Sequence, residues 1–259
     1  MSEILVTRPT PAIAVVTINR PERRNALNLS AWQALRSTFA ALAGDRQIRL
    51  VVLTGTGGHF CAGADISEFA RLRADADSGA VYDREVRAAY EAIRALPQPS
   101  VAAIAGSCAG GGCAIALCCD FRVLHRNARF GIPAAKLGTI YSVEECGLLY
   151  AVVGLANAKR ILYGGDLLDA GAAKEMGFAN AVVDDDVCDR AIAFASRISE
   201  NAPLAIAGMK RILHSLAAGE VERERAHIEG MIRAALDSAD YREGAAAFLE
   251  KRPPRFSGK

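Results

Sequence analysis

The chain has 259 residues, of which 51% are hydrophobic and 23% are charged, so it can bury a large core and is not expected to be disordered. Its formal net charge is +2 without a dense basic or acidic run, so the charge pattern gives no reason to expect a nucleic-acid partner. The N-terminus shows no basic stretch followed by a long apolar run, and no signal peptide is expected.

The seven cysteines lie mostly in apolar segments, with no C-x-x-C repeat and no histidine pair at ligand spacing. The sequence therefore predicts no metal site. Free, buried cysteines are typical of a reducing compartment, and we expect a cytoplasmic protein. The stretch 100–119 is uncharged and nearly as long as a membrane span. Because Gly106 and the run 110–112 divide it, it predicts a buried strand, a turn and a helix, with no membrane association.

Strand-type and helix-type patterns alternate along the first part of the chain. β-branched residues over 12–18 predict a strand, and an uninterrupted apolar run over 48–54 predicts a second strand that is buried on both faces. Between them, apolar residues at helical spacing predict a helix over 31–43, with Ser30 as its N-cap.

The alternation continues through the middle of the chain. A helix is predicted over 80–95, a strand over 101–105, a short helix over 113–119 and another strand over 121–124. From about residue 143 the pattern is almost wholly helical.

The last third contains two clear amphipathic helical patterns, over 203–216 and 221–236. We therefore predict an α/β core over 1–195 and a C-terminal helical region over 196–259. This region would pack on the core or on a neighbouring subunit.

Two glycine-rich turns follow predicted apolar strands, one at 55–58, which leads into the segment 60–65, and one at 110–112. Glycine permits positive φ and close approach of a ligand, and unpaired N–H groups at a helix N-terminus favour negative charge. Two such donors that converge on one oxygen form an oxyanion hole. Taken alone, however, the spacing favours simple tight turns. A dinucleotide fingerprint does not fit, because its third glycine would have to stand at Phe60 or Ile115.

A second hypothesis is a nucleophile elbow with cysteine in place of serine. Residues 106–110 match the pattern with Cys108 at the centre, between a predicted strand and a predicted helix. Asp184 and then His214 or His227 follow in the chain order of a catalytic triad. Both histidines fall in amphipathic helical patterns, and the later strands of an α/β-hydrolase are missing, so this alternative is less favoured.

Several further motifs occur in a fixed order along nearly the whole chain. They are Asn19-Arg20-Pro21, Asn25-Ala26-Leu27-Asn28, Phe60-Cys61-Ala62-Gly63-Ala64-Asp65, Gly106 with Gly110-Gly111-Gly112-Cys113, Cys119-Asp120, Phe130-Gly131-Ile132-Pro133, Leu137-Gly138 and the tail 250–256. With these motifs the chain resembles the crotonase superfamily, also called the enoyl-CoA hydratase/isomerase family.

The resemblance implies an α/β fold, a crotonase-like spiral of ββα units with a C-terminal helical trimerisation region, assembled as a homotrimer or homohexamer. It also implies an acyl-CoA substrate, with coenzyme A as part of the substrate and no separate cofactor. The thioester oxygen would lie between the N–H groups of Ala64 and Gly111. The residues implied to contact the CoA moiety are Arg24, Ala26, Ala62, Asp65, Ile66 and, at the phosphates, Lys251.

The chain departs from the family pattern at two positions. Hydratases of the family carry glutamates where this chain has Ala114 and Ala134. Adding water needs one group that takes its proton and another that protonates the α-carbon, and alanine can do neither. Neither ordinary hydration nor isomerisation by the second glutamate is therefore expected from these positions.

Three nearby residues are candidates for other chemistry. Tyr141 matches a tyrosine of the family's methylmalonyl-CoA decarboxylase-like members, whose hydroxyl helps to hold the departing carboxylate. Decarboxylation of a malonyl-type CoA needs no strong base. Glu144 or Glu145, in the first turn of a helix, could instead act as a relocated base for isomerisation or hydration, although acidic residues there also suit the helix dipole. A non-catalytic acyl-CoA-binding protein is the remaining alternative.

Overall fold

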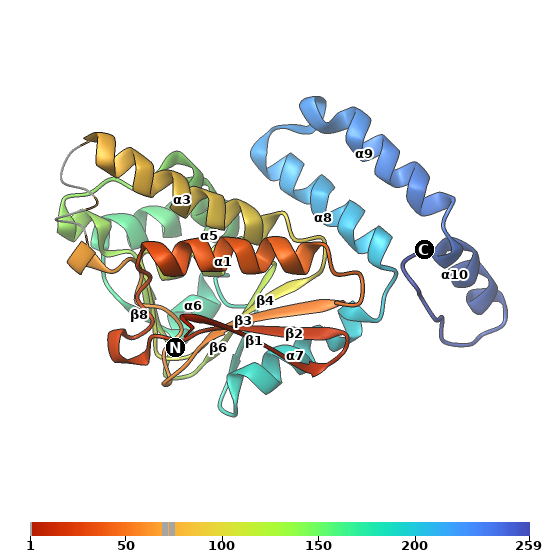
Figure 1. Ribbon diagram of the computed structural model, residues 1–259, viewed down its shortest axis with the longest axis horizontal. Helices are drawn as coiled ribbons and strands as arrows, with labels where there is room; N and C mark the ends of the chain where they lie inside the picture. Colours follow the sequence, from red (N-terminus) through yellow and green to blue (C-terminus); the bar gives the residue numbers. More distant parts are fainter. Residues whose placement is uncertain (1, 69–71, 73–75) are drawn as a thin grey trace.

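The computed structural model describes residues 2–68, 72 and 76–259 (Figure 1). Within this part of the chain, a six-stranded sheet has the order β1-β2-β3-β4-β6-β9. β1 and β2 are antiparallel, and every other neighbouring pair of this sheet is parallel. The strands are β1 (Ile4–Thr10), β2 (Ile13–Ile18), β3 (Leu50–Gly55), β4 (Ser100–Ile104), β6 (Phe121–His125) and β9 (Ala181–Val183).

A smaller sheet brings the two glycine-rich segments together. Its order is β5-β7-β8, with β5 (Ser107–Ala109), β7 (Arg129–Gly131) and β8 (Leu168–Asp169). β5 pairs in parallel with β7, and an isolated parallel bridge joins Cys61 to Cys108 of β5. The segment around Cys61 therefore runs beside the strand that leads into the second glycine run.

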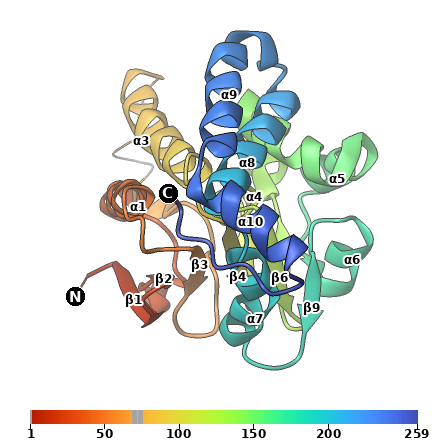
Figure 2. The ribbon, with the colours of Figure 1, turned by 90° about the vertical axis from the view of Figure 1, so that its right-hand side faces the viewer.

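Both faces of the large sheet are covered by helices. Val51 and Leu53 of β3 belong to an apolar cluster shared with α1 and α3, whereas Leu50 and Val52 belong to one shared with α7. Figures 1 and 2 show α1 and α3 on one side of the sheet and α7 on the other. This confirms the prediction of a strand buried on both faces. The helices of this core are α1 (Leu29–Ala43), α3 (Ala76–Arg94), α4 (Gly111–Cys118), α5 (Val143–Gly164), α6 (Ala170–Glu175) and α7 (Val187–Ser199).

The N-cap predicted for α1 is wrong by two residues. Asn28 is the N-cap, because its extended backbone lets its side-chain oxygen accept a hydrogen bond from the N–H of Ala31 at 2.8 Å. Ser30 lies inside the first turn, and its hydroxyl donates to a carboxylate oxygen of Glu3 at 2.6 Å.

Three helices follow the core and extend away from it: α8 (Pro203–Ala218), α9 (Val221–Leu236) and α10 (Ala239–Leu249) (Figures 1 and 2). The boundary predicted at residue 195 falls within α7, which packs on the sheet, and the chain leaves the core just before α8. Among the helices described here, none is long and apolar enough to cross a membrane.

A largely buried ion pair joins α8 to the core. Lys210 Nζ lies 2.7 Å from Asp120 Oδ2 and also donates to the carbonyl oxygen of Gln98 at 3.1 Å. The same carboxylate oxygen accepts hydrogen bonds from the N–H and the hydroxyl of Ser100 at 2.8 and 2.9 Å. A charge removed from water needs such partners, and here they come from both the helical region and the core.

Candidate active site

The segment 60–65 is held against β5 by backbone hydrogen bonds. The N–H of Cys61 donates to the carbonyl of Ser107 at 2.9 Å, and the N–H of Ala109 donates to the carbonyl of Cys61 at 3.0 Å. α4 begins immediately after β5, at Gly111. The first turn of α4 therefore lies directly beside the loop that carries Ala64.

Two glycines permit this close approach. A Cβ added at Gly112 would lie 2.2 Å from the carbonyl oxygen of Cys61. At Gly63, where φ is +101°, it would lie 2.7 Å from the carbonyl oxygen of Ala109. Both distances are far below van der Waals contact, so a side chain at either position would push the helix and the loop apart. These glycines therefore have a packing role that explains part of the glycine-rich pattern.

The backbone nitrogens of Ala64 and Gly111 lie close to the same small space. A Cβ added at Gly111 would lie 3.6 Å from the nitrogen of Ala64, which places the two residues on either side of that point. Within the described residues, neither N–H donates to a protein acceptor. The N–H of Gly111 is one of the unpaired donors of a helix N-terminus, where the helix dipole favours negative charge. Two unpaired N–H donors beside one cavity are the kind of groups from which an oxyanion hole is built.

These donors open onto a cavity of about 340 Å³, a volume within the usual range for small-ligand sites. Of the two positions where family hydratases carry glutamate, Ala134 lines the cavity and Ala114 is fully buried in α4. The described lining residues are Trp32, Ala62, Gly63, Ala64, Ile66, Tyr82, Val86, Tyr90, Gly110, Gly111, Pro133, Ala134, Leu137, Thr139, Ile140, Tyr141 and Glu145.

Tyr141 lines this cavity, and its hydroxyl is buried and unpartnered among the residues that the structure describes. Burial, together with the nearby Glu145 carboxylate, raises the pKa of Tyr141 well above its ordinary value. The hydroxyl therefore stays protonated at neutral pH. It can take part in hydrogen bonds, but it does not act as a phenolate base.

The two candidate glutamates occupy different places. Glu145 lines the cavity, and its two oxygens accept hydrogen bonds from the Tyr90 hydroxyl and the Ser142 N–H, each at 3.0 Å. Ser142 and Glu145 also form the capping box of α5. Glu144 does not line the cavity. Its half-exposed side chain lies 3.6 Å from Arg87.

Two of the six residues expected around CoA line the cavity. Ala62 and Ile66 line it. Arg24 is exposed in a left-handed conformation with φ +50°, and its carbonyl accepts from the N–H of Ala62 at 3.0 Å. Ala26 is half-buried, and its carbonyl accepts a hydrogen bond from Arg20. The hydrogen bond between Arg24 and Ala62 joins the two loops that the resemblance places beside CoA.

Asp65 and Lys251 are placed differently. The Asp65 carboxylate is 8% exposed and is occupied by the Ser67 hydroxyl at 2.6 Å and by Arg20 at 3.1 Å. These contacts, led by the Ser67 hydrogen bond, lower the pKa of Asp65. Lys251 follows α10, and Figure 1 shows α10 and α3 toward opposite ends of the molecule. It is not among the described residues that line the cavity of its own chain.

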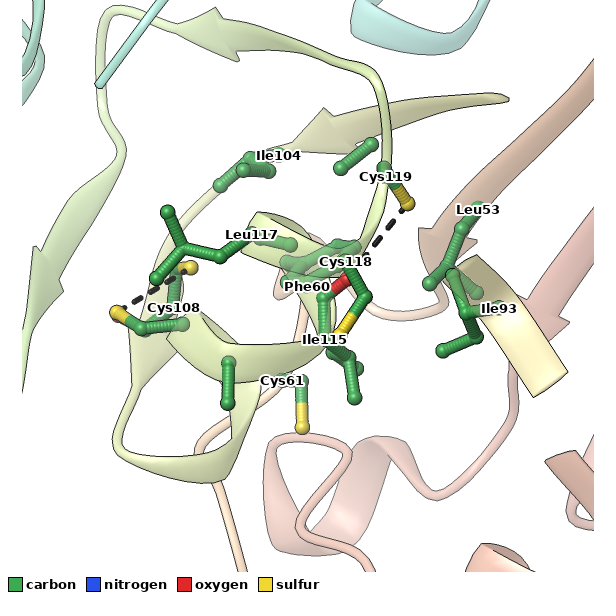
Figure 3. Packing of buried hydrophobic residues seen from close by; sticks show 14 of the residues in the cluster. Leu53, Phe60, Cys61, Ile93, Ile104, Cys108, Ile115, Leu117, Cys118 and Cys119 are labelled. Atoms are coloured by element: carbon green, nitrogen blue, oxygen red, sulfur yellow. Dashed lines mark hydrogen bonds between the residues drawn. The ribbon is translucent and has the colours of Figure 1, made fainter. Parts of the chain in front are cut away.

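Cys108 lies in the core rather than in an open site. Figure 3 shows it with Cys61, Cys118 and Cys119 among the buried side chains around α4. Burial raises the pKa of the Cys108 thiol well above its usual range, which disfavours the thiolate that a nucleophile needs. Asp184 pairs with Arg126 at the surface. Among the described residues, no group of potential ligands is placed to hold a metal ion.

Three aromatic residues of the cavity were not predicted as site residues from the sequence. Trp32 of α1 and Tyr82 and Tyr90 of α3 all line it. Tyr82, Val86 and Tyr90 are spaced four residues apart, which places them on one face of a helix. That spacing was visible in the sequence, but apolar faces of this kind usually mark the core, and only the fold shows that this one borders a cavity.

The family model described as enoyl-CoA hydratase/isomerase matches residues 9–259. The 2,3-dehydroadipyl-CoA hydratase of Escherichia coli K12 is 32% identical over 260 residues, which cover 100% of each chain. The crotonyl-CoA hydratase of Syntrophomonas wolfei is 32% identical over 260 residues, which cover 99% of each. A crystal structure of an enoyl-CoA hydratase/carnithine racemase from Magnetospirillum magneticum has a TM-score of 0.90 at 39% identity, covering 100% of this chain and 97% of that one. The chain therefore belongs to the enoyl-CoA hydratase/isomerase family, and its fold is that of the crotonase superfamily.

Proposed function

We propose that the protein is an enzyme that binds an acyl-CoA thioester and stabilises the enolate oxyanion between the N–H groups of Ala64 and Gly111. The support is the convergence of two unpaired donors, one of them at a helix N-terminus, on a cavity in a protein of this family. Loss of one such donor typically costs about 3–4 kcal/mol of transition-state stabilisation. Coenzyme A takes part as a portion of the substrate, not as a separate cofactor.

The reaction that the geometry supports best is decarboxylation of a malonyl-type CoA. The observation that supports it is the buried, unpartnered hydroxyl of Tyr141, a residue that lines the cavity. A buried donor without an acceptor costs about 1–3 kcal/mol, and a carboxylate on the acyl group would supply that acceptor. When carbon dioxide leaves, the electrons of the broken C–C bond pass to the α-carbon, and the charge is shared with the thioester oxygen at Ala64 and Gly111. No protein base is required for that step.

Isomerisation is the second candidate, because Glu145 is the one carboxylate among the described residues that line the cavity. A single base can move a proton between two carbons of an enoyl group. However, each oxygen of Glu145 already accepts a hydrogen bond, one from the Tyr90 hydroxyl and one from the Ser142 N–H, so both are engaged within the protein. Hydration would need a second acid–base group, and Ala114 and Ala134 provide none. A relocated base at Glu144 is less suited, since that side chain lies outside the cavity.

The CoA moiety would lie along the loops that carry Arg24, Ala26, Ala62, Asp65 and Ile66. Backbone groups rather than the Asp65 carboxylate would make these contacts, because that carboxylate is already occupied. Ala62 and Ile66 at the cavity support this placement.

Lys251 would reach the CoA phosphates of a neighbouring subunit, because it follows α10, away from the cavity of its own chain. Large apolar side chains of α8–α10 that are more than half exposed would be covered in a homotrimer or homohexamer. These are Met209, Leu213, Leu216, Leu236, Tyr241, Phe248 and Leu249. With its free thiols, such an assembly suits the cytoplasm.

One set of assays tests the reaction. Purified protein is incubated with methylmalonyl-CoA, a 3-enoyl-CoA and crotonyl-CoA, and release of carbon dioxide and conversion of each thioester are measured. We expect carbon dioxide release that falls about 10- to 100-fold in Tyr141→Phe, the loss of one hydrogen bond to a charged group. Tyr150→Phe, an exposed tyrosine of α5, is the matched control and should match the wild type.

Other outcomes would assign the protein differently. Turnover of the 3-enoyl-CoA alone, abolished in Glu145→Gln, would replace decarboxylation with isomerisation. Binding of CoA thioesters without any turnover would identify a non-catalytic binding protein. Failure to bind any CoA thioester would overturn the proposed oxyanion site.

A further inference from the structure

Trp32 is a core residue that also borders the cavity. Its side chain is 1% exposed, yet it is one of the lining residues. The indole N–H donates to the Tyr82 hydroxyl at 2.9 Å, and the ring packs edge-on against Tyr90 with centroids 5.6 Å apart. A buried aromatic ring with a satisfied N–H and an aromatic neighbour is held in one position.

The indole lies directly against the oxyanion hole. A Cβ added at Gly111 would lie 3.2 Å from Trp32 Cζ2 and 3.3 Å from Cη2, and 3.6 Å from the nitrogen of Ala64. A thioester whose oxygen accepts hydrogen bonds from Ala64 and Gly111 has to occupy this same space. Its carbonyl carbon and the carbons that follow are then in van der Waals reach of the benzo edge of Trp32.

The aromatic lining that begins with Trp32 continues onto α3. Tyr82, Val86 and Tyr90 lie one turn apart on its cavity face, so they form a row that begins at the partner of the Trp32 N–H. The far end of the row is fixed as well, because the Tyr90 hydroxyl donates to Glu145 at 3.0 Å. The aromatic rings of α1 and α3, held by hydrogen bonds to one another and to Glu145 of α5, therefore line this side of the cavity.

We infer that Trp32, held in place by Tyr82, is a specificity-determining residue that restricts the enzyme to CoA thioesters of short acyl groups. The inference rests on the proposed function, since it takes the thioester oxygen to lie between Ala64 and Gly111. A longer chain would have to displace the indole, break its hydrogen bond to Tyr82 and disturb the contact with Tyr90. A short acyl group fits against the ring edge without moving it.

Binding of saturated thioesters tests this, because they carry no group for decarboxylation or isomerisation. The affinities of CoA and of acetyl-, butyryl-, hexanoyl- and octanoyl-CoA are measured by calorimetry. The wild type should prefer the short thioesters and bind octanoyl-CoA most weakly of the four. Trp32→Leu should reverse this, gaining about fourfold in affinity per added methylene, which corresponds to about 0.8 kcal/mol for each buried methylene. Affinity for CoA itself should not change.

Two further variants distinguish a specific effect of Trp32 on chain-length preference from general damage to the core. Tyr82→Phe keeps the ring but removes the acceptor of the indole N–H. It should shift the preference toward longer chains by a smaller factor than Trp32→Leu does. If Trp32→Leu does not fold, Tyr82→Phe tests the inference in its place. Phe39→Leu alters the same buried face of α1 two turns away, outside the cavity lining, and should keep the wild-type preference. Circular dichroism confirms that each variant is folded.

The chain's single tryptophan supplies an independent readout. Its fluorescence should change on binding of butyryl-CoA and not on binding of CoA alone, because only the acyl group meets the indole. Octanoyl-CoA that binds the wild type as tightly as butyryl-CoA, or an unchanged preference in a folded Trp32→Leu protein, would overturn the inference while the proposed function stood. Absence of binding for every thioester would instead overturn the proposed function.

Discussion

Replacing Gly111 with alanine is a sharp test of the oxyanion hole, because it changes the space between the two donors and leaves both N–H groups in place. The new methyl group would lie 3.6 Å from the nitrogen of Ala64 and 3.2 Å from the ring of Trp32. An oxygen that accepts from both nitrogens must lie about 3 Å from each of them. We therefore expect the methyl group to crowd a thioester oxygen that is bound between the two nitrogens.

The expected cost is at least that of one lost donor, about 3–4 kcal/mol, or a fall in kcat of about 100- to 1,000-fold. Stability should change little. Alanine improves helix propensity by about 1 kcal/mol over glycine, and the tight contact with the Trp32 ring offsets part of that gain. The measurements are turnover of the thioester that the wild type processes and the free energy of unfolding in urea.

Gly147→Ala is the matched control, because this glycine of α5 has open space around the position of a Cβ. It should keep wild-type turnover and gain up to about 1 kcal/mol in stability. If Gly111→Ala is folded and retains turnover within about threefold of the wild type, the thioester oxygen does not bind between Ala64 and Gly111, and the reasoning that places it there fails.

Three further predictions concern stability, each measured as the free energy of unfolding in urea. Lys210→Met should lower it by about 3 kcal/mol, the low end for a buried pair, because the Asp120 carboxylate is 15% exposed and keeps its Ser100 hydrogen bonds when it loses Lys210; a loss below about 1 kcal/mol would show that α8 is held mainly by apolar contacts. Asn28→Ala removes the N-cap of α1 and should cost about 1 kcal/mol, against no measurable loss for an exposed residue such as Ser37→Ala. The Ser67 hydrogen bond holds the pKa of Asp65 below its ordinary value, so its contribution is complete above the unfolded-state pKa of about 4 and is lost as the pH falls through the folded-state pKa. Asp65→Asn should therefore be less stable than the wild type at pH 7, with a smaller difference at pH 3; an equal difference at both pH values would contradict this assignment.

Local pattern determined much of the fold. The uninterrupted apolar run of β3 has both of its faces buried, as predicted, because a strand with apolar residues at successive positions can satisfy all of them only between two layers. α9 spans Val221–Leu236, the bounds predicted from its amphipathic spacing. The ordered motifs around the glycine-rich segments were sufficient to indicate the family that the comparison with known proteins shows.

Near the ends of helices, two neighbouring residues of similar chemistry could each fill the same role. The sequence alone did not show which of the two does so. Asn28 rather than Ser30 caps α1, and Glu145 rather than Glu144 lines the cavity. The choice depends on backbone angles at the helix start and on partners such as Tyr90, which lies on a different helix and far away along the chain.

Only the tertiary structure placed Trp32 beside Gly111 and Lys210 beside Asp120. In the sequence, Trp32 is one apolar residue of an amphipathic helix and Lys210 is one charged residue of another. Periodicity indicates which face of a helix is buried, but it does not show which residues that face contacts. A contact between distant segments is set by how the helices pack on the sheet, and a hydrogen bond or a ring contact forms only once that packing has fixed the distance. The sequence therefore determined the glycine loops and the family, and the packing of α1, α3 and α5 decided which side chains surround them.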